Sequence, residues 1–169
     1  MTTGTETQSI TDWLAGRLPD DWFVGAPEVS VDRDEILVVG TIASPEPPAE
    51  DARAAEAGRI ARFREQTREG RIGVARQAEQ TFGRKLAWGA RCGETRQVFT
   101  SLSVPVMTRL RQRERQVLDT LVDAGVARSR SDALGWAVRL VGKHTEDWLA
   151  QLRTAMEDVA KVRDAGPEV

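Results

Sequence analysis

The stretch 100–141, TSLSVPVMTRLRQRERQVLDTLVDAGVARSRSDALGWAVRLV, carries the clearest structural pattern in this sequence. A strand-like alternation is followed by a helical pattern over about 106–124, which Gly125 is well placed to stop. Ser129 can then cap a second helix, and Asp132 stands where a short acid can return a hydrogen bond to that cap. The stretch therefore predicts a strand followed by two helices joined by a short turn.

The start of the second helix also has the composition of an anion site. Backbone N–H groups in the first turn of a helix have no partner within the helix and attract negative charge. Two arginines flank this turn, so four residues together predict a phosphate contact: Arg128, Ser129, Arg130 and Ser131. An ordinary capped helical hairpin explains the same residues, and both explanations stay open at this stage.

The second helix carries a stripe of apolar residues, several of them small: Ala133, Leu134, Ala137, Val138 and Val141. Small side chains allow two helices to cross closely. The stripe is larger than one helical hairpin can bury, so it predicts a homodimer.

Residues 97–142 resemble the ribbon-helix-helix family, the Arc and MetJ type of DNA-binding dimer. In that family a strand from each subunit pairs across the dimer axis, and the ribbon enters the major groove. The resemblance implies that the turn at Gly125–Leu134 clamps a DNA phosphate. It also implies that Phe99, Ser101 and Ser103 point outward from the strand and contact bases. Alternatively, this strand pairs within its own subunit with 85–92.

The first part of the chain predicts a small antiparallel sheet with a long helix. A short helix over 9–18 precedes a hairpin of 29–31 and 36–42. A long helix over 50–82 follows, and Gly70 and Gly73 are candidate points for a bend. A second hairpin pairs 85–92 with 95–104. The expected fold class is α+β, with an N-terminal α+β domain over 1–95 and a ribbon-helix-helix-like domain over 96–169 that has an extra C-terminal helix.

Charge is unevenly distributed along the chain. Residues 53–144 hold 19 basic and 9 acidic residues, whereas residues 1–52 hold 2 basic and 11 acidic ones. On the long helix, Arg64, Arg68 and Arg71 share one face at spacings of four and three. They could contact nucleic-acid phosphates, or they could pair with the acidic N-terminal block. By contrast, the alternating arginines 109–115 would be spread around a helix and mostly solvated.

Composition limits the chemistry that this chain can perform. Its 169 residues include one cysteine and one histidine, so neither a cysteine-cluster metal site nor a serine–histidine–aspartate triad is easily built. No apolar run approaches the ~20 residues that span a bilayer. The segment 1–10 lacks the basic region and apolar core of a signal peptide. We therefore expect a cytoplasmic protein with no catalytic site, cofactor, metal or membrane partner.

The sequence predicts a non-enzymatic DNA-binding homodimer, such as a small transcriptional regulator or antitoxin-like repressor, whose N-terminal part binds an effector or a partner protein. The alternative is a non-catalytic docking module. It would bind a ribosome, a polymerase or another large assembly, through the arginine-rich helix.

Overall fold

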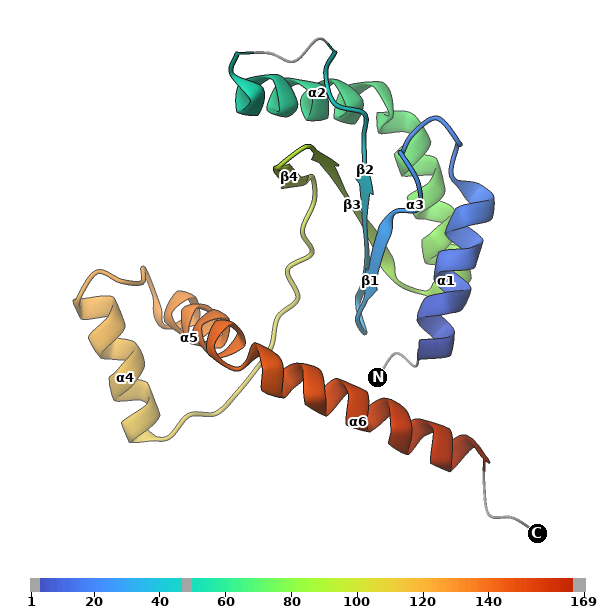
Figure 1. Ribbon diagram of the computed structural model, residues 1–169. Helices are drawn as coiled ribbons and strands as arrows, with labels where there is room; N and C mark the ends of the chain where they lie inside the picture. Colours follow the sequence, from blue (N-terminus) through green and yellow to red (C-terminus); the bar gives the residue numbers. More distant parts are fainter. Residues whose placement is uncertain (1–3, 47–49, 166–169) are drawn as a thin grey trace. The chain divides into compact units, whose positions relative to one another are not determined.

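The computed structural model describes residues 4–46 and 50–165. The chain divides into two compact units, unit 1 over residues 1–104 and unit 2 over residues 105–169. Figure 1 shows a sheet with helices in unit 1, and helices in the described part of unit 2. The expected α+β class is confirmed at this level.

Unit 1 begins with helix α1 (Gly4–Arg17) and the hairpin of β1 (Glu28–Val31) and β2 (Glu35–Thr41). Helices α2 (Ala52–Gln66) and α3 (Arg68–Phe82) follow, and β3 (Lys85–Cys92) and β4 (Thr95–Val98) complete the unit. The first predicted hairpin forms. The second also forms, but its second strand ends at Val98 and does not reach the predicted residue 104. The predicted domain boundary at residue 95 falls at the start of β4, nine residues before the division between the two units.

The sheet has the strand order β1-β2-β3-β4 and is mixed. Each hairpin is antiparallel, but β2 and β3 pair in parallel, with Ile36 opposite Leu86 and Val38 opposite Trp88. The expectation of a purely antiparallel sheet was wrong. The reason is the connection, since a helical crossover through α2 and α3 returns the chain to the same end of the sheet.

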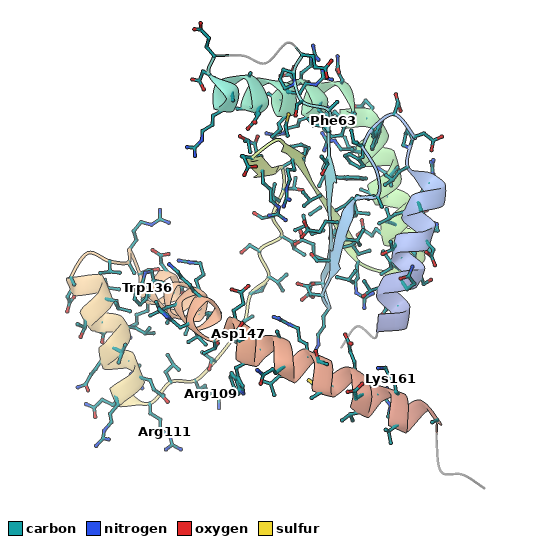
Figure 2. The ribbon with its side chains drawn as sticks, viewed as in Figure 1. Phe63, Arg109, Arg111, Trp136, Asp147 and Lys161 are labelled. Carbon is teal, nitrogen blue, oxygen red and sulfur yellow. The ribbon has the colours of Figure 1, made fainter. Side chains whose placement is uncertain are left out.

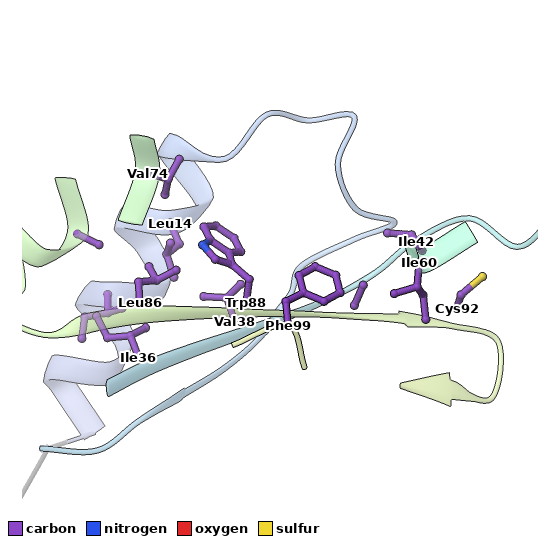
Figure 3. Close-up of a cluster of buried hydrophobic side chains, with 13 residues drawn as sticks. Leu14, Ile36, Val38, Ile42, Ile60, Val74, Leu86, Trp88, Cys92 and Phe99 are labelled. Carbon is purple, nitrogen blue, oxygen red and sulfur yellow. The ribbon is translucent and has the colours of Figure 1, made fainter. Parts of the chain in front are cut away.

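The core of unit 1 lies between the sheet and its helices, as Figure 3 shows. In β2 and β3, side chains at even-numbered positions face this core because successive side chains alternate across a sheet. Burying each large aliphatic side chain stabilises the fold by about 1.5–3 kcal/mol. The labelled members of the core are Leu14, Ile36, Val38, Ile42, Ile60, Val74, Leu86, Trp88, Cys92 and Phe99.

The predicted long helix is two helices that meet at Thr67, not at Gly70 or Gly73. The Thr67 hydroxyl donates to the carbonyl of Phe63 at 2.7 Å, so it competes with the backbone N–H of Thr67 for the same helical acceptor. Gly70 has a different role, because the ring of Trp22 packs against it: a Cβ at Gly70 would lie 2.7 Å from Trp22 Cζ2.

Unit 2 contains α4 (Gln112–Asp123), α5 (Arg130–His144) and α6 (Glu146–Ala165). The second helix begins directly after its predicted cap, Ser129, and the expected extra C-terminal helix is also present. The first helix begins six residues later than predicted, and residues 99–111 form neither strand nor helix. No helix of the described residues is long and apolar enough to cross a membrane.

Candidate nucleic-acid interface

The turn between α4 and α5 has the predicted Gly125 stop and Ser129 cap, but the Asp132 carboxylate accepts from the residue before the cap and not from Ser129 itself. Gly125 has a φ of +73°, and the backbone N–H groups of Val126 and Ala127 both donate to the carbonyl of Leu121. The Ser129 hydroxyl accepts from the N–H of Asp132 at 3.2 Å, and the Asp132 carboxylate accepts from the N–H of Arg128 at 3.0 Å. These bonds satisfy backbone groups that a helix terminus leaves unpaired.

Both arginines of the predicted phosphate contact have carboxylate partners. Arg130 donates from Nε and Nη2 to the two carboxylate oxygens of Asp119, at 2.6 and 2.7 Å. Arg128 Nε lies 3.6 Å from Asp132 Oδ2, although the Arg128 side chain is 95% exposed. A bidentate arginine–carboxylate pair is among the stronger charge-assisted contacts. A phosphate at this turn would therefore have to compete with Asp119 and Asp132.

The same contacts shift the titration of these carboxyl groups. The hydrogen bond from Arg130 lowers the pKa of Asp119 below its ordinary value, and it raises the pKa of Arg130. The backbone N–H of Arg128 is the main cause that lowers the pKa of Asp132. Ser131 is exposed in the first turn of α5. The turn is thus an internally satisfied hairpin cap.

The predicted base-contacting strand is not present. Phe99 follows β4 and donates its backbone N–H to the Trp88 carbonyl at 2.7 Å, but its side chain is buried in the core of unit 1. Ser101 and Ser103 are exposed on a segment outside any strand. Phe99 was expected to point outward. It points inward because its ring packs against Phe63, with ring centroids 6.3 Å apart.

The three arginines of the predicted face on α2 and α3 differ in burial, because Arg71 is buried whereas Arg64 and Arg68 are exposed. Arg71 is only 7% exposed, and its guanidinium lies 5.0 Å from the Phe99 ring centroid. Its Nη2 donates to the carbonyl of Arg64 at 2.6 Å, and its Nε donates to Thr67 Oγ1 at 2.9 Å. Arg71 therefore holds the junction of the two helices. Burial, and then the charges of Arg64 and Arg68, lower its pKa.

Arg64 and Arg68 remain exposed beside this junction. Arg64 lies 5.7 Å from the Phe99 centroid, and Arg68 forms an exposed ion pair with Glu69 at 3.2 Å. None of the three arginines pairs with a described residue of the acidic N-terminal block. Within the described residues, carboxylates of that block pair instead with arginines of later segments, as in Glu6–Arg84, Glu28–Arg91 and Glu28–Arg96.

A basic segment lies at the start of unit 2, where the arginines 109–115 were expected to be spread around a helix. Arg109 and Arg111 precede α4 and Arg113 lies in its first turn, so these side chains are not spread around one helix. Figure 2 shows Arg109 and Arg111 on this approach to α4. All three are exposed, and none forms an ion pair with another described residue. Glu114, which accepts from the Arg111 backbone N–H, is the signal that could have placed the helix start here.

Unit 2 leaves much of its apolar surface exposed. Its buried hydrophobic residues are Leu118, Ala127 and Ala133, counted over the described residues. On α6, Leu152, Met156 and Val159 are 40%, 41% and 68% exposed and follow one another at spacings of four and three. That spacing places them on one face of the helix. Further exposed apolar residues of unit 2 are Val106, Met107, Val117, Val126, Val138, Leu140, Val141, Trp148 and Val162.

Together, the fold and the site define a two-unit protein in which an α+β unit precedes a three-helix unit with a basic approach segment. Residues 8–98 match the family described as "Rv1265-like protein, N-terminal domain", and residues 111–163 match the family described as "Mb1296 C-terminal domain". The chain belongs to the Rv1265-like family.

Two curated relatives are similar over almost the whole chain. The uncharacterized protein Mb1296 of Mycobacterium bovis and the uncharacterized protein Rv1265 of Mycobacterium tuberculosis H37Rv are each 56% identical over 164 residues. The match covers 97% of this chain and 73% of each relative. No solved structure matches the chain.

These matches correct the resemblance to the ribbon-helix-helix family, which was wrong. The segment in question lies largely within the Mb1296 C-terminal domain, and it lacks the strand that a ribbon requires. The resemblance rested on two helices joined by a short turn and on the Ser129 cap. Both features are common to many capped helical hairpins, so they do not identify one family.

Proposed function

We propose that this chain is a non-enzymatic DNA-binding protein that works as a homodimer, with unit 2 as the DNA-binding part. The observation that carries the proposal is the group of three exposed arginines, Arg109, Arg111 and Arg113. They occupy a five-residue stretch without carboxylate partners among the described residues, whereas both arginines of the α4–α5 turn have one. Guanidinium groups bind phosphate bidentately, so such a group suits the DNA backbone.

The proposed contact is with phosphates and does not require base recognition. Neutralising one phosphate contributes about −0.9 to the slope of log K against log salt for duplex DNA. The homodimer carries two copies of this group, so a variant with Arg109→Gln, Arg111→Gln and Arg113→Gln loses up to six phosphate contacts. The magnitude of the slope should therefore fall by up to about 5.4. The measurement is fluorescence anisotropy with a labelled duplex at several salt concentrations.

A matched control separates a local contact from net charge. Arg33, Arg53 and Arg76 are exposed residues of unit 1, and changing all three to glutamine alters the net charge equally. This control should keep the slope and the affinity of the wild type. Equal loss in both variants would show that the binding reflects overall charge, and no loss in either would reject the proposed surface.

The homodimer is supported by the exposed apolar face of α6. Leu149, Leu152, Met156 and Val159 follow a three–four–three spacing, the pattern of a helix that packs lengthwise on another helix. With few buried side chains of its own, unit 2 needs additional apolar contacts, and a second α6 offers a matching face. Sedimentation equilibrium should show dimers. Leu152→Asp with Val159→Asp should give monomers, while Gln151→Asp with Thr154→Asp, which adds equal charge off this face, should remain dimeric.

The second candidate function is docking on a large assembly such as a ribosome or a polymerase. The observation in its favour is the exposure of Arg64 and Arg68 beside the junction of α2 and α3, where the Arg64 guanidinium lies 5.7 Å from the Phe99 ring centroid. Arg64→Glu with Arg68→Glu should then abolish co-sedimentation with ribosomes or purified polymerase and leave DNA binding intact. Retained co-sedimentation would reject this surface.

A further inference from the structure

A cleft of about 340 Å³ lies in unit 1 between the loop that precedes β1 and helix α2. This volume is within the range of small-molecule sites. Three aromatic side chains, Trp22, Phe23 and Phe63, form part of its lining, and Figure 2 labels Phe63 on α2. The other lining residues are Asp21, Val24, Ile42, Ala43, Arg59, Arg62, Gln66 and Thr67.

The aromatic part of the cleft is held in place from several directions. Trp22 and Phe63 meet edge to face with centroids 6.2 Å apart, and Phe23 and Phe63 lie 5.5 Å apart. Two glycines allow the loop to approach closely, because the rings of Phe23 and Trp22 occupy the space that side chains at Gly40 and Gly70 would take. The backbone N–H of Val24 also donates to the Thr41 carbonyl at 2.7 Å. The aromatic surface is therefore preorganised.

The charge of the cleft comes mainly from two arginines on α2. Arg59 is half-buried and donates from Nε to the Ala43 carbonyl at 3.2 Å, which anchors its guanidinium at the cleft. Arg62 lies three residues further along and is exposed. Neither forms an ion pair with a described residue, and Asp21 is the acidic residue in the lining. Two cations face one carboxylate, so the site favours an anion.

We propose that this cleft binds a small aromatic anion. Its ring lies against Trp22, Phe23 and Phe63, and its carboxylate or phosphate group pairs with Arg59 and Arg62. Apolar walls with a few placed charged groups are typical of small-molecule sites, and the half-desolvated Arg59 makes a charge-assisted contact stronger than an exposed one. The proposal does not depend on DNA binding, because the cleft lies wholly within unit 1.

The probe for the test is 1-naphthyl phosphate, titrated into the full chain by isothermal calorimetry. Because the site combines rings with cations, the probe should bind at least about tenfold more tightly than 1-naphthol or inorganic phosphate, a difference of about 1.4 kcal/mol. Arg59→Gln with Arg62→Gln should weaken binding at least about tenfold. Arg33→Gln with Arg76→Gln removes the same charge elsewhere in unit 1 and should leave binding unchanged.

The indole N–H signals of the five tryptophans locate the bound probe by NMR. The indole N–H signal of Trp22 should shift, and the spectrum of Trp22→Phe assigns this signal. The signals of Trp136 and Trp148 in unit 2 should not shift. Larger shifts at Trp136 and Trp148 would mean that the probe binds the exposed apolar helices, which would overturn the proposal. Equal affinity of the probe for the wild type and for the Arg59/Arg62 variant would also overturn it.

Discussion

The ring of Phe23 lies directly over Gly40 of β2, so that a Cβ at Gly40 would lie 2.0 Å from Phe23 Cδ1. No side chain fits between the strand and this ring. The contact ties the loop before β1 to the sheet and places Phe23 in the lining of the cleft.

Replacing Gly40 with alanine should therefore displace the Phe23 ring and destabilise unit 1. Overpacking of this kind costs about 1–3 kcal/mol, measurable as a lower urea midpoint. In a Phe23→Ala background most of that cost should disappear, because the clash is gone. Gly58→Ala is the matched control: it lies inside α2 with open space around it and should be stabilising by about 0.5–1 kcal/mol. Equal costs of Gly40→Ala in both backgrounds would contradict the contact.

Arg71 should be a stability residue and not a binding residue. Arg71→Met removes the hydrogen bonds to the Arg64 carbonyl and Thr67 and should lower the free energy of unfolding by about 2 kcal/mol. Arg68→Met, on the exposed side of the same helix, should change it by less than about 0.5 kcal/mol. Chemical denaturation followed by circular dichroism compares the two. Similar stability of both variants would show that Arg71 does not hold the helix junction.

The stability of unit 2 should fall at acidic pH because of Asp119 and Asp132. Their pKa values are lowered in the folded state from an ordinary 3.8, so the stabilisation is complete well above this pH and is lost as the pH falls through the folded-state values. Asp119→Asn with Asp132→Asn should melt at a lower temperature at neutral pH, and the gap to the wild type should close in acid. Asp123→Asn, near the end of α4, is the control and should follow the wild type. A difference in melting temperature that persists at acidic pH would show that the variant is destabilised by altered packing and not by the loss of charge.

Cys92 should be unreactive in the folded protein. It is fully buried, and desolvation, followed by the nearby charge of Glu56, raises the pKa of its thiol. The thiolate is the reactive form, so native protein should resist iodoacetamide and become labelled only in urea. Adding Ser101→Cys supplies an exposed thiol in the same chain as an internal control. Mass spectrometry should find one label on native protein, at residue 101, and labelling of native Cys92 would contradict the burial.

Patterns between near neighbours in the chain determined much of this protein. The hairpin at Asp32–Glu35, the Gly125 stop and the Ser129 cap were all predicted, because turns and caps depend on residues a few positions apart. The family of the C-terminal unit was not predicted, because a capped helical hairpin occurs in many folds. The start of α4 was also misplaced, since an apolar pattern continues through Val106 and Met107 although these residues are exposed.

Contacts between distant segments decided the rest. The parallel pairing of β2 and β3 follows from the helical crossover and not from the strands themselves. Arg71 looks like an exposed cation by its spacing, yet the Phe99 ring, 28 positions further along, covers it. The cleft exists because Trp22 and Phe63 meet across 41 positions of sequence. Such contacts depend on which buried surfaces fit together, and that fit arises only when the whole unit packs.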